Sequence, residues 1–215
     1  IYNINSNAYS NFTNHPKKNK IKSKNIIFID GNYNHQDMSQ REDIDLSSIK
    51  KKYFELLKNK FFYLEKIFKK KIEICLHPSS NKSAYKKCFK NFKIHKGKTR
   101  EKIYESYMVI FHESSAVMDA MLLNKKILIF ETDLLGKYHS KRVSFFKDSL
   151  KLPSIKIENK TVLTKSQILK KFDQSKKYRN LYIKNNLKSD SSRSPTKKFI
   201  LIINKFINNE KQLNI

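Results

Sequence analysis

Apolar residues recur along this chain with two spacings, one typical of buried β-strands and the other of amphipathic helices. Continuous β-prone runs cover residues 25–29, 72–76, 107–111 and 127–130, and runs of this kind indicate parallel strands buried on both faces of a sheet. Between residues 46 and 70, apolar side chains return every three or four positions, which predicts one long amphipathic helix. The two spacings alternate along the sequence.

Shorter patterns complete the alternation. They predict brief strands at residues 93–95 and 155–157 and further helices at 82–92, 116–123, 166–187 and 196–213. One more helix is predicted between Thr99, its expected N-cap, and the strand that begins at residue 107. The segment from Leu134 to Pro153 is mixed in character and has no assigned element. Strands that alternate with helices predict an α/β fold, a Rossmann-like parallel sheet with helices on both faces.

Length and composition favour a single domain. A chain of 215 residues with 39% hydrophobic content can bury one good α/β core. Residues 1–23, rich in Asn, Ser and Lys, predict an irregular lead-in or linker ahead of one domain over residues 24–215, which includes the carboxyl-terminal helices. The first residue is Ile1 and not Met, so we expect a piece of a longer protein.

The net charge of +27 admits two interpretations. A basic surface of this size favours nucleic acid or an anionic membrane as a partner. The basic residues are mostly Lys, however, and Asn and Ile are also abundant, as an A/T-rich coding sequence produces without selection for binding. Specific nucleic-acid readers tend to use Arg, so we expect no specific nucleic-acid partner, and we allow peripheral association with an anionic membrane.

Cysteine and apolar content predict a cytoplasmic protein. The two cysteines, Cys75 and Cys88, fit a reducing compartment, and Cys75 falls within a predicted strand as a small core residue. No apolar stretch approaches the roughly 18–20 residues that span a bilayer, and no cysteine or histidine spacing supports a zinc site. We therefore expect neither a metal nor a membrane-spanning segment.

Polar corners follow the predicted strands. They are Asp30-Gly31, His77-Pro78-Ser79-Ser80, the Lys96–Thr99 segment, His112-Glu113-Ser114-Ser115, and Glu131. In open α/β sheets, ligands bind outside the carboxyl ends of the strands, where helix N-termini offer N–H groups to an anion. Ordinary turns and helix caps would use the same residue types, and the sequence leaves both interpretations open.

The order of these corners resembles that in a known group of enzymes. The chain resembles the carboxyl-terminal, donor-binding half of GT-B glycosyltransferases of bacterial surface-polysaccharide synthesis in the order of its motifs. These motifs are a strand ending in Asp-Gly, a long helix, a strand ending in His-Pro, a helix that begins at Lys-Gly-Lys-Thr, a strand followed by a His-x-Ser-Ser helix, and the strand Lys-Lys-Ile-Leu-Ile-Phe. Among these glycosyltransferases, the chain most resembles the bacterial sialyltransferase and polysialyltransferase group. The resemblance covers residues 25–135. It implies a glycosyltransferase that moves a sugar from a nucleotide-sugar to a capsule polysaccharide or a lipid-linked glycan.

The resemblance also implies roles for individual residues. The donor phosphates would be bound by His77, Pro78, Ser79, His112, Ser114 and Ser115. The ribose or base would be bound by Gly97, Thr99 and Glu131. The donor, CMP- or UDP-linked, would be used without a metal or another cofactor.

Two departures from the family pattern bear on catalysis. Asp30-Gly31 matches only in part the acidic-acidic-Gly motif that supplies the general base, because residue 29 is Ile, and it falls in the same sheet as the phosphate corners. No second Rossmann-like half precedes residue 25. We therefore expect a chain that is catalytically incomplete alone and requires an amino-terminal GT-B half as partner.

Other classes compete with the glycosyltransferase. A polyanion- or nucleic-acid-binding α/β module predicts aromatic residues interleaved with Lys or Arg on one exposed face. A sugar-nucleotide epimerase-like protein would need carboxylates around the sugar, and the sequence identifies no such set. A truncated, inactive glycosyltransferase is the remaining alternative.

Overall fold

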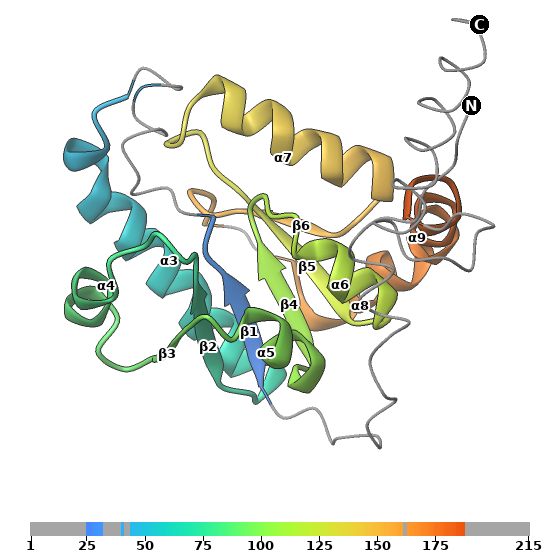
Figure 1. Cartoon of the computed structure of the whole chain (residues 1–215), viewed down its shortest axis with the longest axis horizontal. Coiled ribbons are helices and arrows are strands. Elements are labelled where there is room, and N and C mark those ends of the chain that lie inside the picture. Colours follow the sequence, from blue (N-terminus) through green and yellow to red (C-terminus); the bar gives the residue numbers. More distant parts are fainter. Residues whose placement is uncertain (1–24, 32–39, 41–43, 161–162, 188–215) are drawn as a thin grey trace, which may run out of the picture. The chain divides into compact units, whose positions relative to one another are not determined.

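The computed structural model describes residues 25–31, 40, 44–160 and 163–187 (Figure 1). The chain falls into two compact units, one of residues 20–179 and the other of residues 1–19 with 180–215. The sheet and its covering helices belong to the first unit. The predicted lead-in at residues 1–23 and the predicted helix at 196–213 lie outside the described residues.

The first unit is built on a parallel sheet. Its strands are β1 (Ile26–Ile29), β2 (Ile72–Leu76), β3 (Lys93–Lys96), β4 (Met108–Phe111), β5 (Lys126–Glu131) and β6 (Ser154–Lys156). Every pairing is parallel, and the strand order is β3-β2-β1-β4-β5-β6. This is the order of the doubly wound, Rossmann-like fold, and it confirms the predicted fold class.

Burial follows from the sequence of the strands. All residues of β1, β2 and β4 are buried, as expected for parallel strands covered on both sides. Side chains alternate between the faces along a strand, so Ile26 and Phe28 enter one apolar layer together with Phe61 of the long helix. The Phe28 and Phe61 rings lie 5.1 Å apart in that layer.

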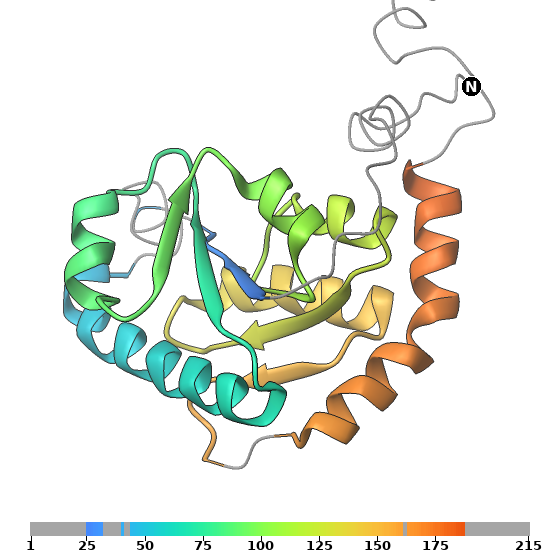
Figure 2. The ribbon, with the colours of Figure 1, turned by 90° about the horizontal axis from the view of Figure 1, so that it is seen from below.

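Helices of the unit that contains the sheet cover both of its faces. They are α3 (Leu46–Phe68), α4 (Lys82–Cys88), α5 (Thr99–Glu105), α6 (Val117–Leu122), α7 (Lys137–Leu150) and α8 (Lys165–Gln174). Helix α9 (Lys176–Tyr182) spans the boundary between the two units, and the π-helical turn Ile183–Leu187 follows it. Figure 2 shows α3 and α8 on one side of the sheet and α5 and α6 on the other. This arrangement agrees with the prediction of helices on both faces.

Helix α3 closely matches its prediction. The Asp45 side chain caps its first turn by accepting a hydrogen bond from the Ser47 amide at 2.9 Å, and the chain leaves the helix through Lys69 in the left-handed conformation. The apolar stripe that predicted the helix is its buried face. The helix ends two positions before the predicted end at residue 70.

Helix α7 was missing from the sequence prediction, which left residues 134–153 unassigned. Its inward residues are His139, Val143, Phe146 and Leu150, of which all but the half-buried Phe146 are buried. Their spacing of four, three and four is helical. The surrounding Lys, Ser and aromatic residues obscured it, because only part of the inward stripe is aliphatic. Within the described part of the chain, no helix combines the length and apolar character needed to cross a bilayer.

Candidate functional site

The predicted site residues gather at one edge of the sheet. All strands run in the same direction, so the corners after β3, β2, β1 and β4 and the end of β5 meet at the carboxyl edge. The strand order changes direction at β1, with β2 and β3 on one side and β4, β5 and β6 on the other. This switch point is where open α/β sheets bind ligands, and the His77 and Ser114-Ser115 corners follow the two strands that flank β1.

Asp30 joins the end of β1 to the corner after β2. Its carboxylate accepts hydrogen bonds from the Ser80 hydroxyl at 2.5 Å, the Tyr85 hydroxyl at 2.7 Å and the His77 amide at 3.4 Å. Asp30 is 2% exposed. A carboxylate that is buried and engaged at both oxygens is poorly placed to accept a proton from an incoming hydroxyl. The contacts of Asp30 hold the corner together, and its predicted catalytic role stays a prediction.

The corner after β2 presents a histidine to solvent. Residues 77–80 form a turn closed by a hydrogen bond from the Ser80 amide to the His77 carbonyl at 3.0 Å. His77, Pro78 and Ser79 are exposed. The Nδ1 atom of His77 accepts from the Ser79 amide at 3.2 Å, which assigns the proton of the neutral ring to Nε2. His77 therefore offers an N–H donor on the exposed side of the turn.

A lysine links this turn to β3. The Lys96 ammonium donates to the Ser80 carbonyl at 2.9 Å, next to Gly97, whose φ of 77° is left-handed. Thr99 is the first residue of α5, with Lys98 in the N-cap position and no side-chain cap. The prediction of Thr99 as N-cap is therefore wrong by one residue, and the predicted ribose-binding role of Gly97 and Thr99 stays a prediction.

His112 differs from His77, although both follow a buried strand. Its ring is 1% exposed, with Nδ1 2.7 Å from the Phe130 carbonyl and Nε2 2.9 Å from the Tyr53 hydroxyl. A carbonyl only accepts, so Nδ1 carries the proton and Nε2 accepts from Tyr53. Burial, reinforced by the neighbouring charge of His139, lowers the pKa of His112 to about 3. Both ring nitrogens of His112 are thus engaged within the fold, and its predicted phosphate-binding role stays a prediction.

Glu113 connects the β4 corner to α7. Its carboxylate pairs with the Arg142 guanidinium, and His139 Nδ1 lies 3.5 Å from the same oxygen. A Cβ added to Gly31 would come within 3.2 Å of the Glu113 carbonyl. The corners after β1 and β4 thus approach closely at the switch point, and the absence of a side chain at Gly31 permits this.

The two serines form a turn ahead of α6 and do not cap it. Ser114 Oγ accepts from the Ala116 amide at 3.2 Å, while the N-cap of α6 is Ala116, which makes no side-chain cap. Helix α6 is one residue shorter at each end than the predicted 116–123. Ser115 is exposed and Ser114 is half-buried.

Glu131 lies at the end of β5 and is already paired. Its carboxylate accepts from the Lys147 ammonium of α7 at 2.7 Å, with the Glu131 side chain 26% exposed. A ribose hydroxyl would compete with Lys147 for this carboxylate. The predicted ribose-binding role of Glu131 stays a prediction.

Sequence reasoning placed Ser80 and Lys96 in the corners but missed Tyr85, Arg142 and Lys147. Ser80, Tyr85 and Lys96 hold the His77 turn. Arg142 and Lys147 of α7 hold the acidic residues after β4 and at the end of β5. Helical spacing in α7 was the available signal for the last two. No local signal marks Tyr85 as a partner of Asp30, which is 55 positions away.

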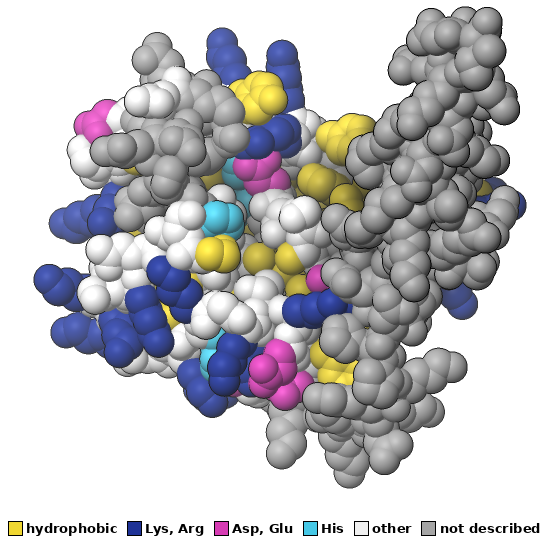
Figure 3. Space-filling model, in the orientation of Figure 1, with side chains coloured by type: hydrophobic (Ala, Val, Ile, Leu, Met, Phe, Trp, Pro, Cys, Tyr) yellow, Lys and Arg dark blue, Asp and Glu magenta, His cyan; other side chains and the backbone are white. Residues whose placement is uncertain are grey.

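Among the described residues, no group of three or more His, Cys, Asp or Glu side chains is placed to hold a metal ion. On the face shown in Figure 3, Lys and Arg side chains gather where α4, β3 and α5 lie in Figure 1.

In comparisons with known proteins, no family model, no curated protein and no solved structure matches this chain.

Proposed function

We propose that this chain is the donor-binding part of a glycosyltransferase and binds the phosphates of a nucleotide-sugar between His77 and the Ser114-Ser115 turn. The observation that carries the proposal is the position of these two corners on the strands that flank β1, at the switch point of the sheet. Neighbouring strands lie about 4.8 Å apart, so the corners are roughly 10 Å from each other. A ligand with a phosphate and a ribose, or with two phosphates, can bridge that distance.

The chemistry of the corners supports the proposal. Transfer from a nucleotide-sugar leaves a phosphate whose negative charge grows in the transition state, and fixed hydrogen-bond donors aimed at it lower the barrier. The His77 ring offers Nε2–H, and its orientation is set by the Ser79 amide. Exposed hydroxyls of Ser79 and Ser115 would add donors. These groups need no metal.

The proposal extends to partners. Because Asp30 is buried and fully engaged, the general base would come from an amino-terminal GT-B half, which would also bind the glycan acceptor. The complex would work in the cytoplasm on a surface polysaccharide or a lipid-linked glycan of a bacterium. The donor would be a CMP- or UDP-sugar.

Calorimetric titration with CMP, UDP and GDP tests the site. Hydrogen bonds to charged groups contribute about 1.5–3 kcal/mol, so His77→Ala should weaken nucleotide binding by roughly ten-fold or more. The double variant Ser114→Ala with Ser115→Ala should do the same, with stability measured alongside because Ser114 also closes a turn. Equal affinities for the wild type and His77→Ala, or no binding of any of these nucleotides at millimolar concentration, would overturn the proposal.

The control must avoid the carboxyl edge. Asn124 follows α6 at the opposite end and has a φ of 49°, which Asn and Gly tolerate better than Ala. Asn124→Gly therefore changes a side chain near the amino ends of the strands without imposing backbone strain. It should leave nucleotide affinity unchanged.

A polyanion-binding module remains a second candidate because one observation favours it. The ring of Tyr107 has the ammonium of Lys70 at 4.7 Å and that of Lys126 at 4.6 Å, and Lys125 lies 5.8 Å from the ring of Tyr104. Interleaved aromatic and basic residues are typical of single-strand binding surfaces. Here, however, the lysines cover the rings and compete with stacked bases for them.

Salt dependence separates the two candidates. If the charge reflects coding composition, binding to duplex DNA should be weak, without sequence preference, and should fall steeply as salt increases. Binding that stays tight at about 0.3 M salt and is lost in Lys126→Glu would favour the polyanion-binding module.

A further inference from the structure

The outer face of α7 exposes two large aromatic side chains to solvent. Tyr138 is 52% exposed and Phe145 is 57% exposed, and these are the two most exposed large apolar side chains in the described ranges. Single exposed aromatics are ordinary. Two that lie seven positions apart on one helix fall on the same side, about 10 Å from each other along the axis.

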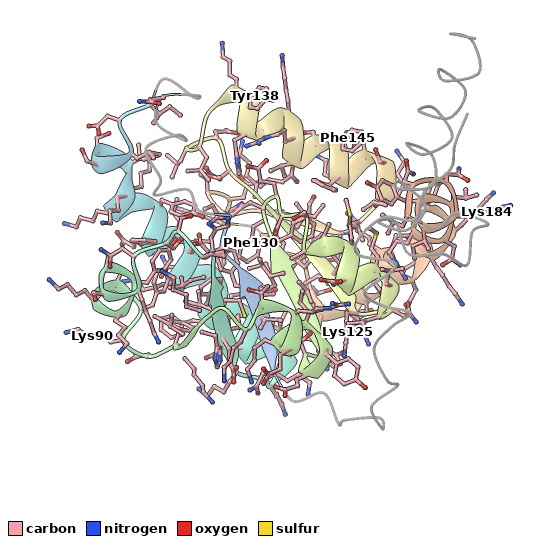
Figure 4. All side chains as sticks on the ribbon, in the orientation of Figure 1. Lys90, Lys125, Phe130, Tyr138, Phe145 and Lys184 are labelled. Atoms are coloured by element: carbon pink, nitrogen blue, oxygen red, sulfur yellow. The ribbon has the colours of Figure 1, made fainter. Side chains whose placement is uncertain are left out.

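Basic residues accompany the two aromatics. Lys141 lies three positions after Tyr138 and four before Phe145, so it occupies the same stripe, and Lys137 lies at the start of the helix. Both lysines are exposed. Figure 4 shows Tyr138 and Phe145 on the side of α7 that points away from the sheet, and Figure 3 shows apolar side chains beside dark-blue ones over this helix.

The other charges of α7 are already used in the fold. Arg142 pairs with Glu113, and Lys147 pairs with Glu131. The Arg142 guanidinium also lies 4.9 Å from the centre of the Tyr138 ring, which limits the orientation of that ring. Lys137 and Lys141 make no ion pair with any other described residue. The face therefore has a positive charge between its aromatic rings. Asp148, exposed seven positions after Lys141, adds one negative charge at the end of the same stripe, which leaves the three charged residues Lys137, Lys141 and Asp148 with a net charge of +1.

We propose that the outer face of α7 is a docking surface for an anionic lipid bilayer, with Tyr138 and Phe145 entering the interface and Lys137 and Lys141 contacting the headgroups. Aromatic rings with lysines beside them are the composition of helices that lie in the membrane interface. The positive charge of the stripe and of the whole chain, +27, complements an anionic leaflet. Phe145, the most exposed ring, has no polar group, so an apolar medium suits it better than water.

This docking would place the carboxyl edge of the sheet next to the bilayer, because Arg142 and Lys147 tie α7 to the residues at the ends of β4 and β5. The inference goes beyond the proposed nucleotide site and does not rest on it. Loss of nucleotide binding and loss of vesicle binding are separate measurements on separate variants.

The chain contains no tryptophan, which allows a selective experiment. In the full chain, Phe145→Trp introduces a single reporter on the proposed surface, and Phe62→Trp introduces a matched reporter on α3, where Phe62 is 47% exposed. With vesicles of phosphatidylcholine containing 30% phosphatidylglycerol, the emission of the Phe145→Trp variant should shift to shorter wavelength and that of Phe62→Trp should not. Vesicles of phosphatidylcholine alone should give a smaller shift.

Sedimentation with the same anionic vesicles tests the charges. Each lysine near an anionic leaflet is worth about 1 kcal/mol, and Lys141→Glu replaces a positive with a negative charge, so it should lower vesicle binding by roughly thirty-fold. Lys90→Glu makes the same change at an exposed position beyond α4, labelled in Figure 4, and should have a clearly smaller effect. The double variant Tyr138→Ser with Phe145→Ser should also reduce binding.

Three outcomes would overturn the proposal. Equal losses for Lys141→Glu and Lys90→Glu would mean that diffuse charge and not this face drives association. A shift of the Phe145→Trp emission with protein concentration in the absence of vesicles would identify a second copy of the chain as the occupant. A shift produced by single-stranded RNA and not by vesicles would identify a nucleic acid.

Discussion

The Tyr53 hydroxyl lies 2.9 Å from Nε2 of His112 in the buried layer between α3 and the sheet. Together with the Phe130 carbonyl at Nδ1, it engages both ring nitrogens of a histidine to which the family resemblance assigned a phosphate-binding role. The bond joins the long helix to the residue that follows β4, next to the switch point of the sheet. It also makes the fold sensitive to the protonation of one ring.

We expect the fold to lose stability in mild acid because of His112. Its pKa is about 3 in the folded state, lowered mainly by burial, against an ordinary value of 6.5. The unfolded chain binds the proton first, so the stability from the neutral ring is fully present above pH 6.5 and is lost as the pH falls towards 3. Between pH 6 and 4.5, this one group should lower the free energy of unfolding by about 1.4 kcal/mol per pH unit.

Denaturant unfolding at several pH values checks this. His112→Gln should flatten the pH dependence by roughly one proton relative to the wild type. Tyr53→Phe should instead keep the wild-type slope while costing about 1–3 kcal/mol at every pH, because Nε2 loses its partner. The same slope in wild type and His112→Gln would contradict the assignment of a neutral, buried ring.

Asp30 should matter for stability. Its carboxylate holds Ser80, Tyr85 and the His77 amide, and bonds to charged groups are worth about 1.5–3 kcal/mol each. In Asp30→Asn, one oxygen becomes an NH₂ group that cannot accept from these donors, so we expect a loss of about 2–4 kcal/mol in the free energy of unfolding. Asp148→Asn, on the exposed side of α7, is the control and should change stability by less than about 0.5 kcal/mol.

A second readout separates holding the corner from catalysis. Ser80→Ala, which removes one bond to Asp30, should cost about 1–2 kcal/mol and should weaken nucleotide binding only as far as the His77 turn loosens. If Asp30→Asn is as stable as the control, Asp30 does not hold the corner, and that result would favour its predicted role as a general base.

The two cysteines should differ in reactivity. Burial raises the pKa of the Cys75 thiol to about 12, the Glu73 carboxylate adds to this rise, and Lys102 opposes it. Cys88 is only partly buried. A thiol reagent such as dithiobisnitrobenzoate reacts with the thiolate, so the native chain at pH 8 should show one accessible thiol and the unfolded chain two. Cys88→Ser should remove the native reaction, and two rapid equivalents in the native wild type would contradict the burial of Cys75.

The sequence by itself determined the fold class and the composition of the carboxyl edge. Continuous apolar runs such as Met108–Phe111 predict buried parallel strands because both faces of the sheet are covered, and the polar residues that end each run must then meet at one edge. The long helix was also predictable, since its apolar stripe repeats through more than six turns. These are local patterns, and local patterns set which elements form.

Only the tertiary structure decided which of the edge residues face solvent. His77 and His112 both follow apolar strands, but His112 continues the face of Met108 and Ile110, where α3 crosses and Tyr53 meets its ring. His77 lies in an exposed turn. Likewise, Asp30 is engaged by residues about 50 positions away. Burial and hydrogen bonding of a polar side chain depend on contacts distant in sequence, and the spacing along a strand does not contain them.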